Sequence, residues 1–292
     1  MRVLVATDGS ADARAAIEWL EEFPLPATAD VLVLAVAELA PVPLEFPRVR
    51  DLDPYVLGAM RRAAEEARDA LGARWPTTTL RVVEGDPREA IPTIADEWGA
   101  DLVVVGARGV SAVHRFLLGS VSTAVVHAAR CPVLVVKPHP LTCKDIVIGV
   151  DGSTDSLAAV RFVAGLPLGP ATMVRLLGVI RRPYTPRTAP ESVMPLVRRA
   201  VDDIVTERRA ELAGVLATVG EMFEKRGAKL EHVGRVGAPA EEILEEANDG
   251  LTDLVVVGAR GLGGLKRCVL GSVSERVLHH ATCPVLVVKD GG

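Results

Sequence analysis

The part of the sequence best suited to chemistry is a glycine spacing that occurs twice. Gly106 and Gly109 are followed, after nine further residues, by Gly119-Ser120. Glycine permits positive φ angles and close backbone approach to a ligand. A loop that leaves a buried strand and enters a helix also offers unpaired N–H groups and a partial positive charge. This spacing therefore predicts a cradle for phosphate groups.

The second copy is Gly258, Gly261 and Gly271-Ser272, with the same intervals. Because Ser120 and Ser272 are expected to open their helices, each hydroxyl can cap the helix or contact a phosphate oxygen. A lone Gly-x-x-Gly would more often only turn the chain. Two copies with one long spacing favour binding, although a duplication would also copy an inactive loop.

The duplication extends well beyond this loop. Asp101–Gly109 recurs 152 residues later as Asp253–Gly261, and the closing phrase that begins at Cys131 recurs at the same interval from Cys283. The openings around Asp8 and Asp151 match at an interval of 143 residues. A period of this length indicates duplicated domains rather than a solenoid. The proline-marked linker between the copies predicts domains at residues 1–138 and 144–292.

Strand and helix patterns alternate through each copy. In the first, the apolar runs predict strands and the helically spaced stretches predict helices, with Ser10 as an N-cap. The expected strands are Arg2–Thr7, Val31–Val36, Leu80–Val83, Leu102–Val105 and Val133–Val136, and the expected helices are Ala11–Glu22, Pro54–Leu71, Pro87–Trp98 and Ser120–Ala129. Such alternation predicts an α/β fold with a doubly wound parallel sheet. Ligands of these sheets bind beyond the carboxyl ends of the strands.

Composition excludes several classes of function. The chain has 292 residues, 49% hydrophobic and 24% charged, and a net charge of −5 without a long run of one sign, which disfavours a nucleic-acid partner. Its apolar runs are far shorter than the ~20 residues that cross a bilayer, so no membrane association is expected. The N-terminus enters a strand pattern at once, and the four cysteines form no C-x-x-C pair. These features predict a cytoplasmic protein.

The whole chain resembles the universal stress protein family in its tandem form. The resemblance rests on the Asp8-Gly9-Ser10 opening, the glycine loop and the closing Cys-Pro-Val-Leu-Val-Val, and it covers both halves. It implies two tandem Rossmann-like domains of the adenine nucleotide alpha hydrolase type, each a five-stranded parallel sheet flanked by helices. In that family the glycine loop marks the ATP-binding subgroup. The implied ligand is ATP, with or without Mg²⁺, and no metal site of the protein's own is expected.

The resemblance also implies residue roles. Asp8 and Asp151 would face the adenosine, and the backbone near Val36 and Val179 would meet the base. The ribose and phosphates would be held by Gly106, Gly109, Gly119, Ser120, Val121 and Ser122 in the first half, and by Gly258, Gly261, Gly271, Ser272, Val273 and Ser274 in the second.

Several of these positions have a second interpretation. Arg108 and Arg260 could reach phosphate or be solvated turn residues, and the two aspartates could be simple turn residues. His127 and His279 favour surface or packing roles over metal binding. Cys268, inside the second loop, has no counterpart in the first half and leaves a redox role open. The proline-rich stretches Pro41–Pro54 and Pro183–Pro195 are expected near the strand ends.

Three classes of function remain open. The favoured one is a nucleotide-dependent stress-response regulator or sensor that is not an enzyme and has no catalytic residues. The second is a slow ATPase or another ATP-using enzyme, although no Walker motif is present. The third is a dimerisation module with empty pockets. Because single-domain members of the family pair through their last strand, Val133–Val136 and Val285–Val288 are expected to pair within the chain as an intramolecular pseudo-dimer, with further homodimerisation left open.

Two predictions concern the loops themselves. Replacing Gly119 and Gly271 by bulky residues should abolish nucleotide binding while leaving the fold largely intact. The first site should also bind more tightly than the second. Gly263 and Gly264 raise the entropic cost of ordering the second loop, and the charge of Lys266 offsets this only in part.

Overall fold

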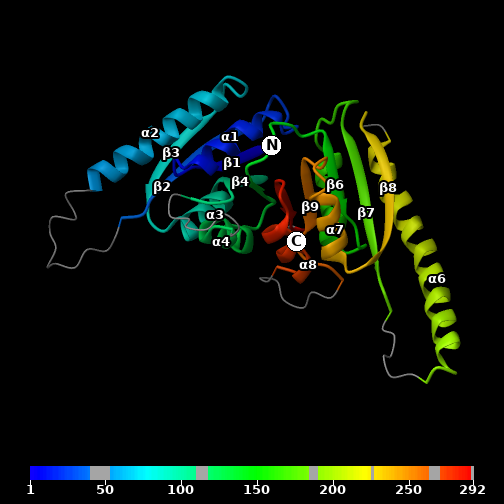
Figure 1. The fold of residues 1–292 in the computed structure, drawn as a ribbon. Helices are drawn as coiled ribbons and strands as arrows, with labels where there is room; N and C mark the ends of the chain where they lie inside the picture. The colour runs from blue at the N-terminus through cyan, green and yellow to red at the C-terminus, as the bar shows by residue number, and fades with distance from the viewer. Residues whose placement is uncertain (40–52, 110–117, 184–189, 225–226, 263–269, 291–292) are drawn as a thin grey trace.

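The computed structural model describes residues 1–39, 53–109, 118–183, 190–224, 227–262 and 270–290. Its first half alternates strands and helices as the sequence predicts (Figure 1). The elements are β1 (Arg2–Ala6), α1 (Ala11–Glu22), β2 (Asp30–Ala37), α2 (Asp53–Gly72), β3 (Thr79–Glu84), α3 (Pro87–Trp98), β4 (Leu102–Gly106), α4 (Ser120–Ala128) and β5 (Val133–Val136). The Ser10 hydroxyl accepts a hydrogen bond from the Ala13 amide, which confirms the predicted N-cap of α1.

The second half repeats this order. Its elements are β6 (Asp145–Gly149), α5 (Thr154–Ala164), β7 (Met173–Arg181), α6 (Met194–Gly220), a 3₁₀ turn (Glu221–Phe223), β8 (Lys229–Gly237), α7 (Pro239–Ala247), β9 (Leu254–Gly258), α8 (Ser272–His280) and β10 (Val285–Val288). Ser153 caps α5 as Ser10 caps α1, through a hydrogen bond from the Ser156 amide.

All ten of these strands form one sheet in the order β3-β2-β1-β4-β5-β10-β9-β6-β7-β8. Strands within each half are parallel, which confirms the predicted doubly wound sheets. The two halves meet where β5 pairs antiparallel with β10, with Leu134 opposite Leu286. The predicted pairing of the last strands is therefore confirmed, and each strand covers the edge of the other.

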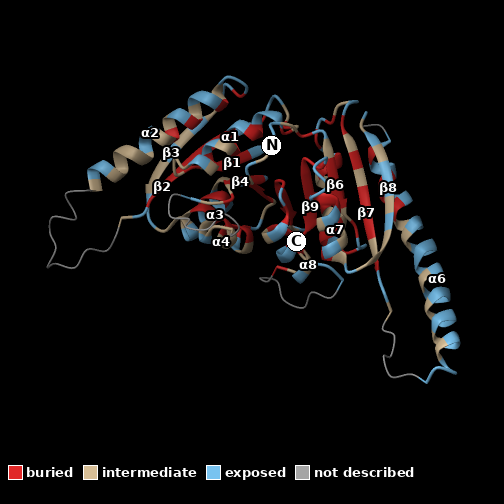
Figure 2. Cartoon of the chain, in the orientation of Figure 1, coloured by how far each residue is buried: buried red, intermediate tan, exposed pale blue. Residues whose placement is uncertain are grey.

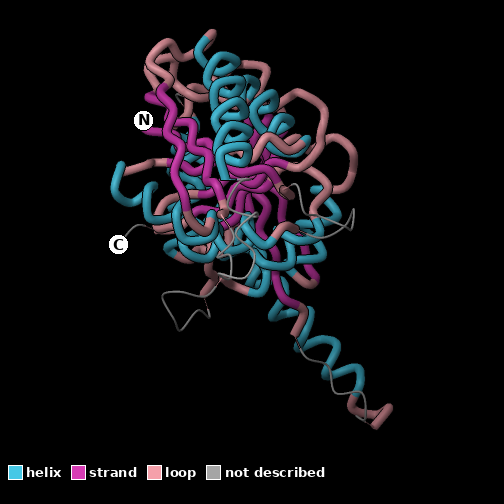
Figure 3. Tube along the Cα trace, turned by 90° about the vertical axis from the view of Figure 1, so that its left-hand side faces the viewer, coloured by secondary structure: helices cyan, strands magenta, loops and turns pink. Residues whose placement is uncertain are grey.

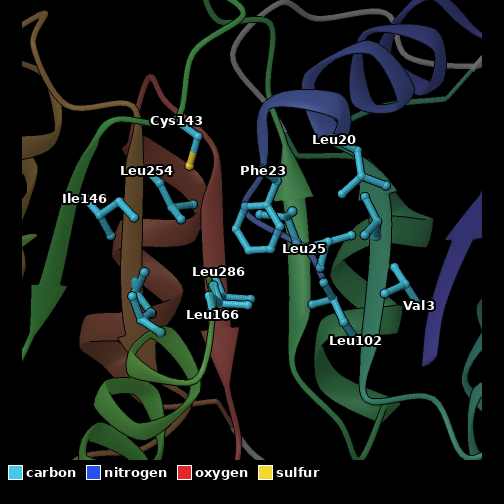
Figure 4. Close-up of a cluster of buried hydrophobic side chains, with 14 of the residues drawn as sticks. Val3, Leu20, Phe23, Leu25, Leu102, Cys143, Ile146, Leu166, Leu254 and Leu286 are labelled. Atoms are coloured by element: carbon cyan, nitrogen blue, oxygen red, sulfur yellow. The ribbon is translucent and has the colours of Figure 1, made fainter. Parts of the chain in front are cut away.

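Helices cover both faces of the sheet, and the core on each face is continuous across the two halves. One apolar cluster lies under α1, α2, α5 and α6, and the other under α3, α4, α7 and α8. Figure 2 shows buried positions concentrated on the strands and on the inner sides of the helices. At the seam, Phe23 of the first half lies in one cluster with Leu286 and Cys143 of the second (Figure 4). The halves thus share a core instead of merely touching.

Two lysines add polar contacts across the seam. Lys137 follows β5, and its amine donates hydrogen bonds to the carbonyls of Leu278 (2.8 Å) and Ala281 (2.5 Å) at the end of α8. Lys289 follows β10 and donates to the carbonyls of His127 (3.0 Å) and Ala129 at the end of α4. A cation at a helix C-terminus satisfies carbonyls that have no partner within the helix and offsets the negative end of its dipole.

The halves differ most in the helix that covers their outer strands. The 27-residue α6 is longer than α2, and its N-terminal part extends past the end of the sheet (Figure 3). Residues buried on α6 cluster at its end, at Leu216, Val219 and Gly220. The parts of the predicted proline-rich loops at residues 40–52 and 184–189 lie outside the described residues.

Candidate nucleotide-binding site

In each half, a pocket lies at the carboxyl ends of the strands, where the fold class predicts a ligand. The cavities measure about 610 Å³ in the first half and 740 Å³ in the second. Both volumes fall in the range of ~300–1,000 Å³ that is typical of small-molecule sites. Matching positions line the two pockets, and they include Asp8, Val36, Gly106, Arg108, Gly109, Gly119, Ser120, Val121 and Ser122 in the first, and Asp151, Val179, Gly258, Arg260, Gly261, Gly271, Ser272, Val273 and Ser274 in the second.

The start of α4 forms one wall of the first pocket, and the start of α8 forms the same wall in the second. Gly119 and Gly271 occupy the N-cap positions, and no side chain caps either helix there. The Gly119 amide donates to the Ala107 carbonyl at 2.8 Å, and the Gly271 amide donates to the Ala259 carbonyl at 2.7 Å. The following N–H groups have no carbonyl within the helix to bond. This end of the helix therefore offers donors and a partial positive charge to an anion.

The motif glycines have a packing role inside the protein. None of those described has a positive φ, contrary to the conformational argument made from sequence. A Cβ on Gly106 would lie 2.8 Å from the backbone of Asp12 in α1, and one on Gly258 would lie 2.6 Å from the backbone of Asp155 in α5. These two glycines let the strand end approach the helix, as expected where two backbones pack closely.

Gly109 and Gly261 make room for a carboxylate. A Cβ on either residue would lie 2.6 Å from the Oδ2 atom of Asp8 or Asp151 respectively. Each carboxylate also accepts a hydrogen bond from the amide two residues later, Ser10 at 2.9 Å and Ser153 at 3.0 Å. The turn role and the pocket role considered for these aspartates are therefore compatible, since each holds its turn and lines its pocket.

Arg108 and Arg260 hold the loop against the neighbouring helix. The Arg108 Nε lies 2.8 Å from Oδ2 of Asp12, and the Arg260 Nε lies 2.8 Å from Oδ2 of Asp155, whose side chain is 1% exposed. The Arg260 backbone amide donates to the same carboxylate at 3.0 Å. Neither interpretation made from the sequence included this pairing. The sequence did contain a signal for this pairing, because the same aspartate and arginine recur in both halves at the intervals of the repeat.

The two inner serines also bond within the loop. The Ser122 hydroxyl donates to the Gly106 carbonyl at 2.7 Å, and the Ser274 hydroxyl donates to the Gly258 carbonyl at 2.5 Å. Both side chains are buried. Because each hydroxyl proton is already donated, these serines are better placed to shape the loop than to donate to a phosphate. Ser120 and Ser272 stand at the helix start beside the pocket, with Val121 and Val273 next to them.

Among the described residues that line the two pockets, none is a cysteine or a histidine. Within the described residues, no group of histidines, cysteines and acids could hold a metal ion. Burial raises the pKa of Cys131 to about 11 and that of Cys283 to about 12, so both remain thiols at neutral pH. Over the same described ranges, no helix is long and apolar enough to cross a membrane. Cys268 and most of the two loop interiors lie outside the described residues.

A family model settles the affiliation that this geometry suggests. The model of the universal stress protein family matches residues 1–137 and 142–289, which is nearly the whole chain in two copies. The chain belongs to the universal stress protein family. It is therefore a tandem member, with one family domain on each side of the β5–β10 seam.

Universal stress proteins from other organisms match at full length. One from Mycolicibacterium smegmatis is 31% identical over 98% of this chain and 96% of its own length. One from Mycobacterium tuberculosis is 29% identical over 99% of this chain and 97% of its own length. Among solved structures, a universal stress protein from Archaeoglobus fulgidus has a TM-score of 0.71 at 20% identity, covering 99% of this chain and 98% of that one. At that identity the last match supports the fold alone.

Proposed function

We propose that each half of this universal stress protein binds ATP or a related adenine nucleotide, with or without Mg²⁺, at its glycine loop. On this proposal the protein is a nucleotide-dependent regulator or sensor in a stress response, and not an enzyme. The cytoplasm is the compartment we expect, since the described cysteines, Cys131, Cys143 and Cys283, are free thiols, as is usual in a reducing compartment.

The observation that carries the proposal is the wall of each pocket. The start of α4 or α8 lies beside Gly119-Ser120 or Gly271-Ser272, without a side-chain cap, at the carboxyl edge of a parallel sheet. Such a helix end favours an anion by its unpaired N–H groups and its dipole. The apolar part of the same pocket, near Val36 or Val179, suits a planar base.

The best test replaces the serines that open the two helices. Ser120→Asp and Ser272→Asp place a negative charge at a helix start, where a carboxylate supports the helix but repels phosphate. Ser120→Asn and Ser272→Asn are the matched neutral controls. We expect calorimetry to show ATP binding by the wild type and the asparagine variants, and a loss of at least about tenfold in affinity in the aspartate variants.

These variants are preferable to bulky replacements of Gly119 and Gly271. A Cβ on Gly119 would lie 3.1 Å from the Ala107 carbonyl, and one on Gly271 would lie 3.2 Å from the Ala259 carbonyl. Lost binding in such variants could then come from a displaced loop. Equal ATP affinity in the wild type and in the double aspartate variant would contradict the proposed site.

Mass spectrometry of gently purified protein separates the three classes of function. Bound ATP supports the sensor, and conversion of added ATP to ADP or AMP supports the enzymatic alternative. Protein that neither carries nor binds nucleotide would leave the dimerisation module as the remaining class.

A further inference from the structure

The two pockets match closely except in charge at one position of their rims. Glu38 follows β2 and lines the first pocket, and Arg181 ends β7 and lines the second. Both residues are exposed, and they lie 143 residues apart, the same interval that relates Asp8 to Asp151 and Val36 to Val179. Since side chains two apart on a strand face the same way, each stands on the same side as the pocket-lining valine. The sign of the charge at this place is therefore inverted between the halves.

The next residue widens this difference. Arg182 follows Arg181, whereas the apolar Leu39 follows Glu38. One cation partly offsets the difference on the first side, since Arg14 donates to the Gly9 carbonyl at 2.5 Å and its counterpart is Leu157. With these three places taken together, the second pocket remains more positive than the first by two unit charges.

Other charged groups near the pockets are matched or internally paired. Asp8 and Asp151 are equivalent, and the two loop arginines are each paired with an aspartate. On the first side, Arg88 pairs with Asp86 at 2.5 Å. On the second side, Arg235 contacts Glu246 and lies 3.4 Å from Glu245 and 3.6 Å from Glu242. None of the described side chains in these Arg88 and Arg235 pairs is among the residues that line either pocket, so the contrast between Glu38 and Arg181 remains at the rim itself.

We propose that the two pockets sort nucleotides by charge, the second favouring the more highly phosphorylated nucleotide and the first tolerating the less charged one. This inference rests on the proposed function, because it presumes that both pockets take a nucleotide. ATP carries about two more negative charges than AMP near neutral pH. A pocket that is more positive by two charges therefore gains more from ATP than from AMP, wherever in the pocket the extra phosphates lie.

The size of this preference for ATP is limited because the charged side chains at the two rims are exposed to solvent. An exposed ion pair is worth a few tenths of a kcal/mol to about 1 kcal/mol, or about a twofold to fivefold change in affinity. Since two protein charges change, we expect the ratio of AMP to ATP dissociation constants to be about tenfold larger at the second pocket. Binding of ATP at the second pocket should also weaken more steeply with added salt.

The experiment measures that ratio one pocket at a time in the full-length chain. Ser272→Asp weakens the second pocket, so that the first is measured as the tighter site, and Ser120→Asp does the reverse. Each protein is titrated with ATP and with AMP by calorimetry at constant ionic strength and without Mg²⁺. In these backgrounds, Glu38→Arg should raise the ratio at the first pocket and Arg181→Glu should lower it at the second. Glu38→Gln and Arg181→Gln should give intermediate ratios.

The possible outcomes test charge sorting and nucleotide binding separately. Equal ratios at the two pockets, or ratios that the charge reversals leave unmoved, would overturn charge sorting while leaving nucleotide binding intact. Failure of either pocket to bind ATP or AMP in the wild-type chain would instead refute the proposed function, and this inference with it. A steeper salt dependence at the first pocket would also contradict the inference.

Discussion

Removing the charge of Lys137 tests the seam between the halves through its pH dependence. Burial lowers the pKa of Lys137 from its ordinary value of 10.5 to about 8. The folded protein therefore holds a proton on this amine less tightly than the unfolded chain does. Below pH 8 the lysine is charged in both states, and its burial cost is present in full. As the pH rises from 8 to 10.5, the folded amine loses its proton and this cost is relieved.

The size of the effect follows from the shift in pKa. A shift of about 2.5 units at 1.36 kcal/mol per unit is worth ~3 kcal/mol over that window. The hydrogen bonds from Lys137 to Leu278 and Ala281 at the negative end of α8 oppose the shift, because they favour the charged amine. We therefore take ~3 kcal/mol as an upper limit. The direction of the effect is unchanged: the contribution of Lys137 to the free energy of unfolding rises with pH.

Buried thiols act in the opposite direction. Burial raises the pKa values of Cys131, Cys143 and Cys283, so these groups keep their protons in the folded state after the unfolded chain has released them. Each thiol then lowers the free energy of unfolding by ~1.4 kcal/mol per pH unit above about pH 9. The wild-type protein should accordingly lose stability in this range, and the lysine contribution must be obtained by difference.

The assay is urea unfolding of the wild type and Lys137→Met at several pH values between 7.5 and 10. We expect the free energy of unfolding of the wild type, minus that of the variant, to increase over this range by up to ~3 kcal/mol. The exposed Lys144 provides the control, since Lys144→Met should give a flat difference. A difference for Lys137→Met that is flat or falls with pH would refute the burial cost assigned to this amine.

Three further predictions concern stability and reactivity. Arg175→Ala should lower the free energy of unfolding by ~1–3 kcal/mol in urea, because Asp145 loses its guanidinium partner and the nearly buried Glu246 keeps only that of Arg235; an effect below ~1 kcal/mol would contradict this. Gly258→Ala should destabilise the protein by ~1–3 kcal/mol, because the new Cβ would lie 2.6 Å from the backbone of α5. Gly72→Ala is the control, since nothing lies within 4 Å of its added Cβ. Equal shifts of the melting temperature in the two variants would refute the packing role of Gly258. In a Cys268→Ser background, a thiol reagent at pH 7.5 should modify Cys143 and Cys283 only at the rate of unfolding, because both are buried; fast modification of the folded chain would disagree.

The sequence was sufficient to predict the helices and strands and the pairing of the two halves through their last strands. Buried strands such as Leu102–Gly106 and Val133–Val136 appear in the sequence as short apolar runs, and the N-cap at Ser10 is a local signal. Pairing of β5 with β10 followed from the resemblance and from the need to cover two sheet edges.

Contacts between distant segments were harder to predict. The Arg108–Asp12 pair joins residues 96 positions apart, and nothing local to either residue marks it. Gly106 lines the first pocket and also packs against the backbone of α1, and this second contact was not predicted, because a sequence shows that a side chain is missing but not what occupies the space. The charge inversion between Glu38 and Arg181 was readable at the 143-residue interval, and it gained meaning only when both residues proved to line a pocket.

Each half contributes a lysine that binds the C-terminal end of a helix in the other half. The helix that forms the wall of each pocket, α4 or α8, therefore depends on the opposite half for this contact. The N-terminus of α4 belongs to the first pocket, yet its C-terminal carbonyls are bonded by Lys289 of the second half, and α8 is held by Lys137 in the same way. Either half expressed alone would lose this anchor and would expose β5 or β10 as an open strand edge. Such a half could cover this strand edge by pairing with a second copy of itself. In the tandem chain the same pairing is intramolecular, so the two pockets stay assembled at any protein concentration. Because the two halves are separate parts of one sequence, the residues at the two pocket rims can also differ.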